Sequence, residues 1–246
     1  MKDSSAVTPA YETPSRCLGR LNWGFIEQSL NTQGFVVLPD LIPPAQARMM
    51  AGLYSDDTLF RARINMESHG FGRGEYKYFR YPIPPEIQDL RTRLYRYLAP
   101  IANRWHAAMG LPARFPLEHT EFIQRCHDAG QMRPTPLLLN YGSDDYNCLH
   151  QDLYGEHVFP LQATILLSQP GEDFEGGEFV MTKQMPRRQS QALVAPLGFG
   201  DTIVFAVNFL PVPGKRGVTR AALRHGVSRV TAGHRQTLGI IFHDAR

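Results

Sequence analysis

The chain has 246 residues, of which 43% are hydrophobic and 20% charged, an ordinary composition for a globular protein. Its net charge is +3 and its pI about 8.8. This is below the pI of more than about 9 that is typical of a dedicated nucleic-acid-binding domain, although a local basic patch could still bind phosphate. The sequence has no apolar run long enough to span a membrane, so we expect no membrane partner.

The N-terminal residues 1–15 are polar and contain two prolines. They lack the apolar stretch of a secretion signal, so we expect a flexible tail. The three cysteines, Cys17, Cys126 and Cys148, are few and widely spaced. This pattern favours reduced thiols in the cytoplasm over a disulfide framework.

The first half of the chain is predicted to be mostly helical. Apolar residues recur every three or four positions from Ile87 to Trp105, which predicts a long amphipathic helix between Pro85 and Gly110. Shorter helices are predicted over residues 25–31, 45–54 and 117–129, with one short strand over residues 34–38. We expect these elements to support the rest of the molecule.

After Pro134 the pattern changes to short strand-like runs separated by Gly, Pro and Asp. The predicted strands cover residues 137–141, 146–150, 161–167, 178–182, 193–196, 202–207, 221–230 and 236–242. Eight strands at this spacing favour an antiparallel jelly roll of the cupin kind. We therefore predict an α+β fold with one domain over residues 16–246, in which residues 16–130 pack against a jelly-roll core formed by residues 131–246.

His150 and Asp152 are the most informative residues of the chain. They follow a strand-like run, and residues two apart in a strand point to the same face. With one more imidazole they would form the two-histidine, one-carboxylate set that binds non-haem Fe(II). The most plausible third ligand is His225, which lies in another strand-like run. Zinc could use the same ligands.

A basic residue, Arg235, follows His225 by ten positions. We expect an antiparallel hairpin to return Arg235 to the same end of the barrel as His225. A buried guanidinium there needs an anion, and its planar geometry fits a carboxylate. A zinc site alone would not explain this residue.

Together these features resemble the Fe(II)/2-oxoglutarate-dependent dioxygenases, especially their prolyl-hydroxylase-like branch. The likeness includes His-x-Asp, the distant histidine, the basic residue ten positions later and Tyr141, nine residues before His150. It also includes the segments 176–179 and 200–205.

The resemblance implies a double-stranded β-helix core in which His150, Asp152 and His225 bind Fe(II), while Arg235 and Tyr141 hold 2-oxoglutarate. It implies O2-dependent hydroxylation with decarboxylation of 2-oxoglutarate to succinate. Because Asp152 is intact, oxygen insertion is favoured over halogenation.

Segments 70–76, 133–139 and 224–229 resemble a bacterial group of these oxygenases proposed to act, like AlkB-type enzymes, on alkylated DNA bases. Such enzymes hydroxylate an N-methyl group, which is lost as formaldehyde, after the base leaves the stack. Cations and aromatic rings are interleaved between Phe60 and Tyr81, which suits nucleic-acid contact. The glycines of this segment predict a flexible loop that could fold over a substrate. An edge strand packed by its aromatics is an equal alternative. Candidate substrate residues are Arg73, Tyr76, Tyr78, Phe209 and Arg224.

Other substrates stay open. The apolar pair Phe209 and Leu210 stands where the bacterial group tends to carry polar residues, which favours a small molecule such as a specialised metabolite or amino acid. A peptide side chain is a third candidate, and a non-catalytic cupin-like binding module is a remote one. A second basic cluster, Arg187–Arg188 with Lys215–Arg216, is more typical of loop charge. Whether Arg224 or Arg229 contacts substrate is not decided by the sequence.

Overall fold

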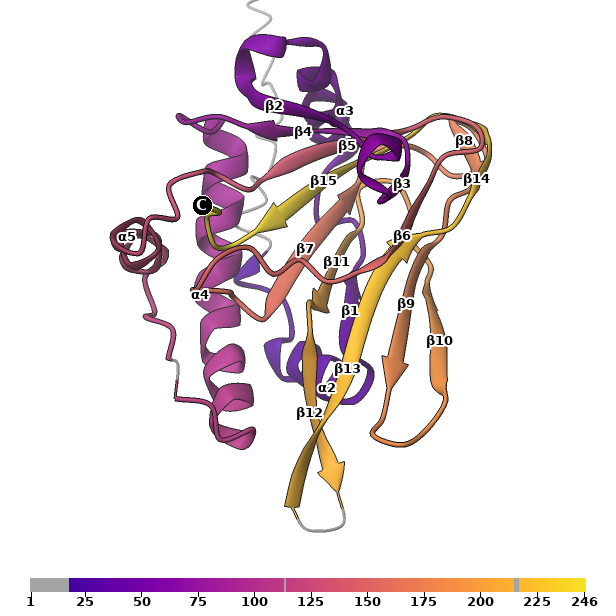
Figure 1. The fold of residues 1–246 in the computed structure, drawn as a ribbon. Helices are drawn as coiled ribbons and strands as arrows, with labels where there is room; N and C mark the ends of the chain where they lie inside the picture. Colours follow the sequence, from indigo (N-terminus) through magenta and orange to yellow (C-terminus); the bar gives the residue numbers. More distant parts are fainter. Residues whose placement is uncertain (1–17, 113, 215–216) are drawn as a thin grey trace, which may run out of the picture.

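Two antiparallel sheets face each other in the computed structural model of the protein, and the longest helix packs against the outside of the larger sheet (Figure 1). The structure describes residues 18–112, 114–214 and 217–246. The predicted tail 1–15, Cys17 and the pair Lys215–Arg216 lie outside the described residues. Among the described helices, none is long and apolar enough to cross a lipid bilayer.

The four predicted helices are all present. They are α2 (Trp23–Gln33), α3 (Pro44–Gly52), α4 (Pro85–Ala108) and α5 (His119–Asp128), with short 3-10 turns at η1 (Leu53–Ser55), η2 (Asp57–Leu59) and η3 (Glu67–His69). Helix α2 begins where the Asn22 side chain accepts a hydrogen bond from the Phe25 amide, and it ends at Gly34, whose φ of +85° suits glycine.

The larger sheet has seven strands in the order β1 (Phe35–Leu38), β11 (Thr202–Ala206), β7 (Leu161–Leu166), β15 (Arg235–Ile241), β5 (Leu137–Tyr141), β4 (Glu75–Phe79) and β2 (Phe60–Asn65). The smaller sheet has the order β10 (Ser190–Ala195), β9 (Phe179–Gln184), β13 (Gly217–Val227), β6 (Tyr146–His150) and β3 (Gly72–Arg73), and β12 (Phe209–Gly214) pairs with β13. A short pair, β8 (Phe174–Gly176) and β14 (Val230–Gly233), lies at one end. This is the predicted double-stranded β-helix with helical support.

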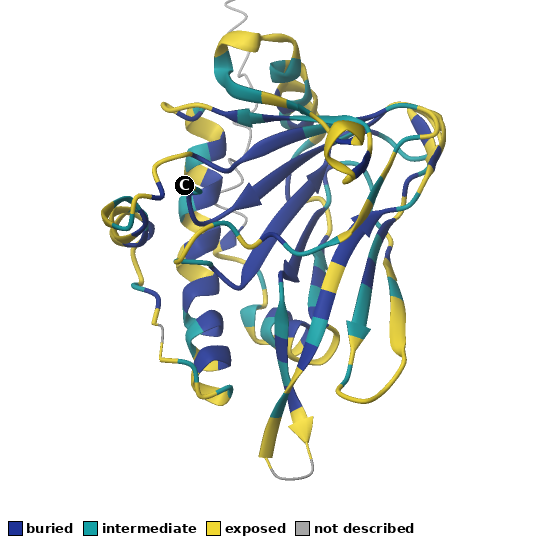
Figure 2. Ribbon diagram, in the orientation of Figure 1, coloured by how far each residue is buried: buried dark blue, intermediate teal, exposed yellow. Residues whose placement is uncertain are grey.

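The main hydrophobic core lies between α4 and the seven-stranded sheet. The apolar stripe of α4 that the sequence predicted is buried, and it belongs to the same cluster as Leu138, Leu238 and Ile240 of the sheet. All six residues of β7 are buried, as expected for a strand covered on both faces (Figure 2). The sheet is therefore a rigid support for side chains on its inner face.

Residues 60–81, for which a flexible loop and a packed edge strand were equal alternatives, consist mostly of strands, which favours the second. Strands β2 and β4 extend the larger sheet, and β3 extends the smaller one. The glycines serve close packing: a Cβ on Gly72 would lie 2.3 Å from the Tyr146 carbonyl oxygen, and one on Gly74 would lie 2.9 Å from Cδ1 of Tyr141. Because β1, β2 and β4 share a sheet with the later strands, the chain has no structural division at residue 130.

Candidate metal and co-substrate site

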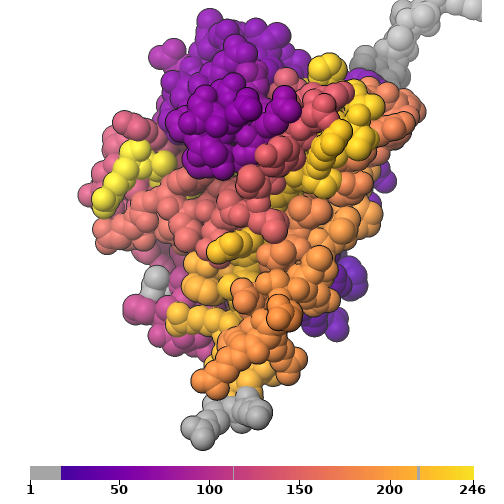
Figure 3. All heavy atoms as spheres, turned by 45° about the vertical axis from the view of Figure 1, so that its right-hand side comes forward, coloured from indigo at the N-terminus to yellow at the C-terminus, as the bar shows by residue number. Residues whose placement is uncertain are grey.

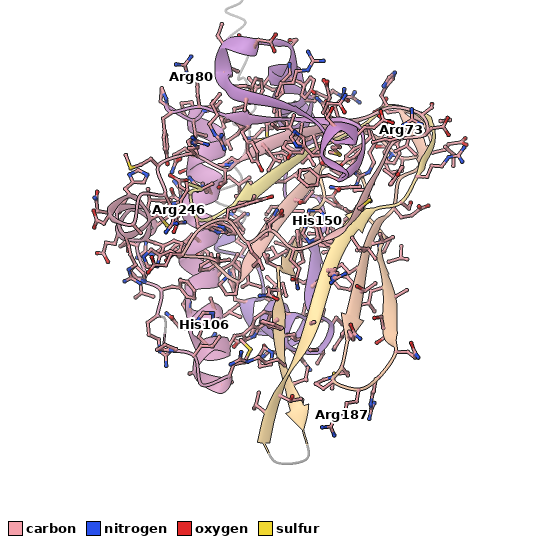
Figure 4. The ribbon with its side chains drawn as sticks, viewed as in Figure 1. Arg73, Arg80, His106, His150, Arg187 and Arg246 are labelled. Carbon is pink, nitrogen blue, oxygen red and sulfur yellow. The ribbon has the colours of Figure 1, made fainter. Side chains whose placement is uncertain are left out.

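His150, Asp152 and His225 meet between the two sheets. Strands β6 and β13 are antiparallel neighbours that place His150 directly opposite His225. Asp152 follows the end of β6, with one carboxylate oxygen 3.4 Å from Nε2 of His150 and the other 3.4 Å from Nε2 of His225. One ligand atom from each residue lies within 4.8 Å of the other two, and Figure 4 shows His150 in the middle of the molecule.

The orientation of each imidazole is fixed by its surroundings. Nδ1 of His150 donates a hydrogen bond to the Cys148 carbonyl oxygen at 2.8 Å, so its Nε2 lone pair points at the site. His225 is buried against two phenyl rings, those of Phe205 at 4.6 Å and Phe179 at 6.0 Å between ring centroids. Both Nε2 atoms are thereby directed toward Asp152.

The charges of the three groups are strongly coupled. Burial alone would raise the pKa of the Asp152 carboxyl, but hydrogen bonds and charge from His150 and His225 hold it well below its usual range. Burial and the charge of His150 lower the pKa of His225. For His150, burial opposes protonation, yet the hydrogen bond and charge of Asp152 raise the pKa above its usual value. The carboxylate therefore stays ionised and available to a cation.

Tyr154 also contacts this carboxylate, and sequence reasoning missed it. Its hydroxyl donates a hydrogen bond of 2.7 Å to Oδ1 of Asp152, and the hydroxyl of Tyr78 is hydrogen-bonded to Tyr154 in turn. Burial raises the pKa of Tyr154, so it remains a neutral donor. With Oδ1 held in this way, Oδ2 is left for a metal ion. The spacing His150-x-Asp152-x-Tyr154 carried the signal, because it continues the alternation of the strand.

The donor set fits Fe(II). Two imidazole nitrogens and one carboxylate oxygen on one side of a cavity match the arrangement that leaves coordination positions open in non-haem iron oxygenases. The hydrogen bonds to His150 and Asp152 are the outer contacts that usually orient such ligands.

Arg235 is the second element of the site. It is 1% exposed, and its Nε and Nη1 atoms have no hydrogen-bond partner among the described residues. Burial lowers its pKa to about 10, so it remains charged near neutral pH. It lies opposite Tyr141 in the β15–β5 register, and a Cβ on Gly177 would lie only 2.8 Å from its Cδ atom. A buried guanidinium without an anion requires one, and a carboxylate of 2-oxoglutarate fits this position.

The expected hairpin between His225 and Arg235 does not form. Strand β13 belongs to the smaller sheet and β15 to the larger, and β14 between them pairs with β8. The two residues meet because the sheets face each other: both line one cavity of about 330 Å³. Other lining residues include Tyr141, Asn147, Gln162 and Thr164. Among the described residues that line this cavity, Arg235 is the only arginine or lysine.

The structure separates the candidate substrate residues into two groups. Tyr76 and Tyr78 line the cavity, whereas Arg73, Phe209 and Arg224 do not. Arg224 precedes His225 on β13 and is exposed on the other face, and Phe209 lies under the guanidinium of Arg220 at 5.8 Å. Neither residue lines the cavity, and their contact with substrate stays a prediction. Arg73 lies near the β3 edge (Figure 4), with its side chain 49% exposed and 3.9 Å from Asp145.

Most cations of the 60–81 segment are used within the protein. Lys77 is buried and bonds Asp57 at 2.6 Å, Arg63 bonds Glu75 at 2.6 Å, and Arg61 lies 4.5 Å from the Tyr78 ring centroid. Figure 3 shows the side chains of this part of the chain, in purple, gathered beside residues of the β5–β6 region. Arg187 of the second basic cluster lies at the opposite end of the molecule from Arg73 (Figure 4). Most of the described cations of the 60–81 segment are therefore not free to bind phosphate.

Comparison with known proteins identifies the family. Residues 74–245 match the Oxygenase-NA family, described as an oxygenase catalysing oxidative methylation of damaged DNA. Two relatives from Mycobacterium tuberculosis, the uncharacterised proteins Rv2227 and MT2286, are each 45% identical over 167 residues, which is 68% of this chain and 72% of theirs. The chain belongs to this family of oxygenases.

Solved structures agree on the fold. A 2-oxoglutarate–Fe(II) oxygenase-family protein from Burkholderia pseudomallei aligns with a TM-score of 0.55 and 17% identity, covering 92% of this chain and 93% of that one. A prolyl-4-hydroxylase from Pseudomonas putida aligns with a TM-score of 0.54 and 12% identity, covering 91% and 99%. With its His-Asp-His set, the protein is a 2-oxoglutarate-dependent non-haem iron dioxygenase that uses Fe(II), 2-oxoglutarate and O2.

When bound, Fe(II) and 2-oxoglutarate would supply the O2 activation needed to hydroxylate a substrate C–H bond, with release of succinate and CO2. The residues of this chain orient that chemistry. His150, Asp152 and His225 offer three donors from one side, Tyr154 fixes the Asp152 carboxylate, and Arg235 offers unpaired N–H donors to the same cavity.

Proposed function

We propose that the enzyme hydroxylates an N-alkyl group on a nucleic-acid base, with His150, Asp152 and His225 as iron ligands and with Arg235 and Tyr141 holding 2-oxoglutarate. Insertion of one oxygen atom converts an N-methyl group to N-hydroxymethyl, which then breaks its N–C bond and leaves as formaldehyde, restoring N–H on the base. The other oxygen atom ends in succinate. The family description supports a substrate in damaged DNA.

The observation that carries this proposal is the form of the cavity. Its volume of about 330 Å³ lies at the small end of the range for ligand sites, which suits a co-substrate with one small flat group. Tyr76, Tyr78 and Tyr154 line it, and aromatic walls are the usual contact for a base outside the helix stack.

The entrance of the cavity offers a further stacking contact. Phe71 and Leu149 line the cavity and yet are 47% and 42% exposed, so they lie at its opening. The Phe71 ring stacks on His69 at 5.4 Å between centroids. An exposed ring held at the opening can stack against the bases that flank a flipped nucleotide. Arg73 follows Phe71 by two residues, on the edge strand β3, and its half-exposed side chain is available to contact phosphate.

The test uses short single-stranded DNA oligonucleotides, each with one N-methylated base, incubated with the iron-loaded enzyme, 2-oxoglutarate and O2. Mass spectrometry should detect loss of one methyl group, with succinate formed in equal amount. Binding should weaken steeply as salt is raised, since phosphate contacts release counterions. Phe71→Ala should weaken binding about tenfold, whereas Phe25→Ala, at an exposed phenylalanine on α2, should not.

A small-molecule substrate is the second candidate, because Arg235 is the only arginine or lysine among the described residues that line the cavity. Succinate formation that no oligonucleotide stimulates, and that salt does not affect, would support this candidate and contradict the nucleic-acid proposal. We also propose a cytoplasmic location, which is supported by the two described cysteines, Cys126 and Cys148, being free thiols.

A further inference from the structure

The inner face of the larger sheet is polar at two separate places. Alternate residues of β15, from Arg235 to Ile241, line the cavity, as do Gln162 and Thr164 of β7. The β15–β7 register pairs Ile241 with Gln162 and Gly239 with Thr164. Gln162 therefore lies beside the end of β15 that is remote from Arg235.

The co-substrate cannot reach both places at once. Six residues of extended strand separate Arg235 from Ile241, which is roughly 20 Å. The five-carbon chain of 2-oxoglutarate spans roughly 5 Å between its carboxyl carbons. A molecule anchored on Arg235 therefore leaves Gln162 without a contact.

Gln162 lies instead on the metal side of the cavity. The β11–β7 register places it opposite Phe205, and the Phe205 ring packs on the imidazole of His225 at 4.6 Å. The space that Gln162 faces is thus close to the metal ligands and away from the co-substrate anchor, as expected for the position of the primary substrate.

The side-chain amide of Gln162 is buried, and its oxygen has an unsatisfied hydrogen-bonding capacity, which is unusual for a buried amide. The residue is 4% exposed, and its Oε1 atom has no hydrogen-bond partner among the described residues. A second buried glutamine, Gln131, provides the contrast: its Nε2 donates to the carbonyl oxygens of Tyr154, His157 and Asp244, and its Oε1 accepts from the His157 amide. Buried amides are normally satisfied in this way, so the unsatisfied oxygen of Gln162 points to a ligand.

We propose that Gln162 is a specificity-determining residue for the primary substrate, and that its amide oxygen accepts a hydrogen bond from an exocyclic amino group on the base. This inference rests on the proposed function and narrows it. The amide oxygen is an acceptor without a negative charge, so it suits an N–H donor rather than phosphate or carboxylate. Glutamine can also pair its oxygen and nitrogen with the adjacent N–H and ring nitrogen of an aminopurine. Tyr78 and Tyr154 line the same cavity and supply faces for the ring.

The experiment compares three single-stranded oligonucleotides that carry 1-methyladenine, 3-methylcytosine or 3-methylthymine. The first two keep an exocyclic amino group, and the third has none. Binding is measured by fluorescence anisotropy with Mn(II) in place of iron and with 2-oxoglutarate present, so that no turnover interferes. Oxidation is measured separately on the iron-loaded enzyme.

The natural protein should bind the two amino-bearing oligonucleotides about tenfold more tightly than the 3-methylthymine one. Gln162→Leu should bring that ratio close to one. Gln162→Glu, which keeps an acceptor oxygen, should retain the preference. The matched control is Gln236→Leu on the same sheet: Gln236 alternates with the cavity-lining Arg235 and Thr237 and bonds the Ala51 carbonyl oxygen. This variant should leave the ratio unchanged.

Two failures are distinguishable. If all three oligonucleotides bind and the ratio is the same in Gln162→Leu as in the natural protein, the role of Gln162 is overturned while the nucleic-acid substrate stands. If none of the three binds or is oxidised, the nucleic-acid proposal is overturned, and this inference with it.

Discussion

Two of the arginines that the structure describes, Arg91 and Arg235, are almost completely buried, and their hydrogen bonding differs sharply. Arg91 on α4 donates to Asp244 at 2.8 Å and to the Ile241 carbonyl oxygen at 2.9 Å, and only its Nη1 atom lacks a partner. Asp244 in turn accepts from Tyr81 and His127. We call these four residues the C-terminal cluster. Arg235, in contrast, has no partner for Nε or Nη1.

The difference separates a structural charge from a functional one. The C-terminal cluster ties α4 and α5 to the end of the chain, and each of its two buried charges faces the other. At Arg235 two buried N–H groups have no hydrogen-bond partner among the described residues. Buried charged groups need hydrogen-bond partners, so these unpaired donors are evidence for a binding site.

The strongest test of this comparison removes one carboxylate from each region: Asp152 from the metal site and Asp244 from the C-terminal cluster. Asp152→Ala should lower 2-oxoglutarate turnover at least about 100-fold, because a metal ligand is lost. Succinate formation and bound iron are the measurements. The Asp244→Asn variant should turn over 2-oxoglutarate at the rate of the natural protein, when the rate is expressed per folded molecule. Full activity in Asp152→Ala would mean that the metal site is assigned wrongly.

The same Asp244→Asn variant should be much less stable. Removing one partner of a buried ion pair typically costs about 3 to 5 kcal/mol, because the other charge is left without compensation. Urea denaturation followed by circular dichroism gives the free energy of unfolding. A loss below about 1 kcal/mol would show that the C-terminal cluster is not the structural charge pair described above.

Arg235→Lys should act on the co-substrate alone. An ammonium group cannot form the two parallel hydrogen bonds of a guanidinium, so the KM for 2-oxoglutarate should rise about tenfold or more. The free energy of unfolding should change little, since Nε and Nη1 of Arg235 have no hydrogen-bond partner among the described residues. Arg91→Lys is the matched control and should show the reverse: reduced stability with an unaltered KM. Equal effects of the two substitutions on KM would remove the distinction.

Acid should weaken the region around α4 and α5 before the carboxylates titrate. Burial and the charge of Arg91 lower the pKa of His119 from 6.5 to about 3. The unfolded chain takes up this proton near pH 6.5 and the folded protein does not, so stability is fully present above pH 6.5 and is lost as pH falls toward 3. By pH 5 the loss from His119 is about 2 kcal/mol. Urea denaturation at pH 7 and pH 5 measures it.

His119→Gln keeps a donor to the Phe242 carbonyl oxygen, which His119 contacts at 2.8 Å through Nε2, but it does not titrate. The stability of this variant should fall less between pH 7 and pH 5 than that of the natural protein. The same decrease in both would show that His119 does not cause the acid sensitivity.

The smallest expected effect concerns the hydroxyl that fixes Asp152. Tyr154→Phe removes the 2.7 Å hydrogen bond to Oδ1 and should weaken metal binding about tenfold. Competition with a metal-sensitive dye under anaerobic conditions gives the affinity. Tyr95→Phe, which removes a buried hydroxyl bonded to the Pro116 carbonyl oxygen, is the control and should leave metal affinity unchanged. Equal affinities for the natural protein and Tyr154→Phe would mean that Oδ1 needs no outer contact.

The sequence by itself determined the elements that depend on local pattern. The 3.6-residue period of α4 predicted the long helix, because periodicity reports which face is buried. Short runs separated by Gly, Pro and Asp predicted β5 and β6. The spacing of His150 and Asp152 and the ten-residue interval from His225 to Arg235 likewise indicated the class of oxygenase. These signals are either local patterns in the chain or a residue order that resembles that of a known family of oxygenases.

Only the tertiary structure decided which distant residues share a space. The 60–81 segment became edge strands because Gly72 and Gly74 allow β3 and β4 to approach β6 and β5 closely, an approach with no counterpart in the local pattern. The place of Gln162 in the cavity, and the exclusion of Phe209 and Arg224 from it, follow from the way two sheets face each other. Long-range register places these side chains, and neighbouring residues in the chain carry no information about it.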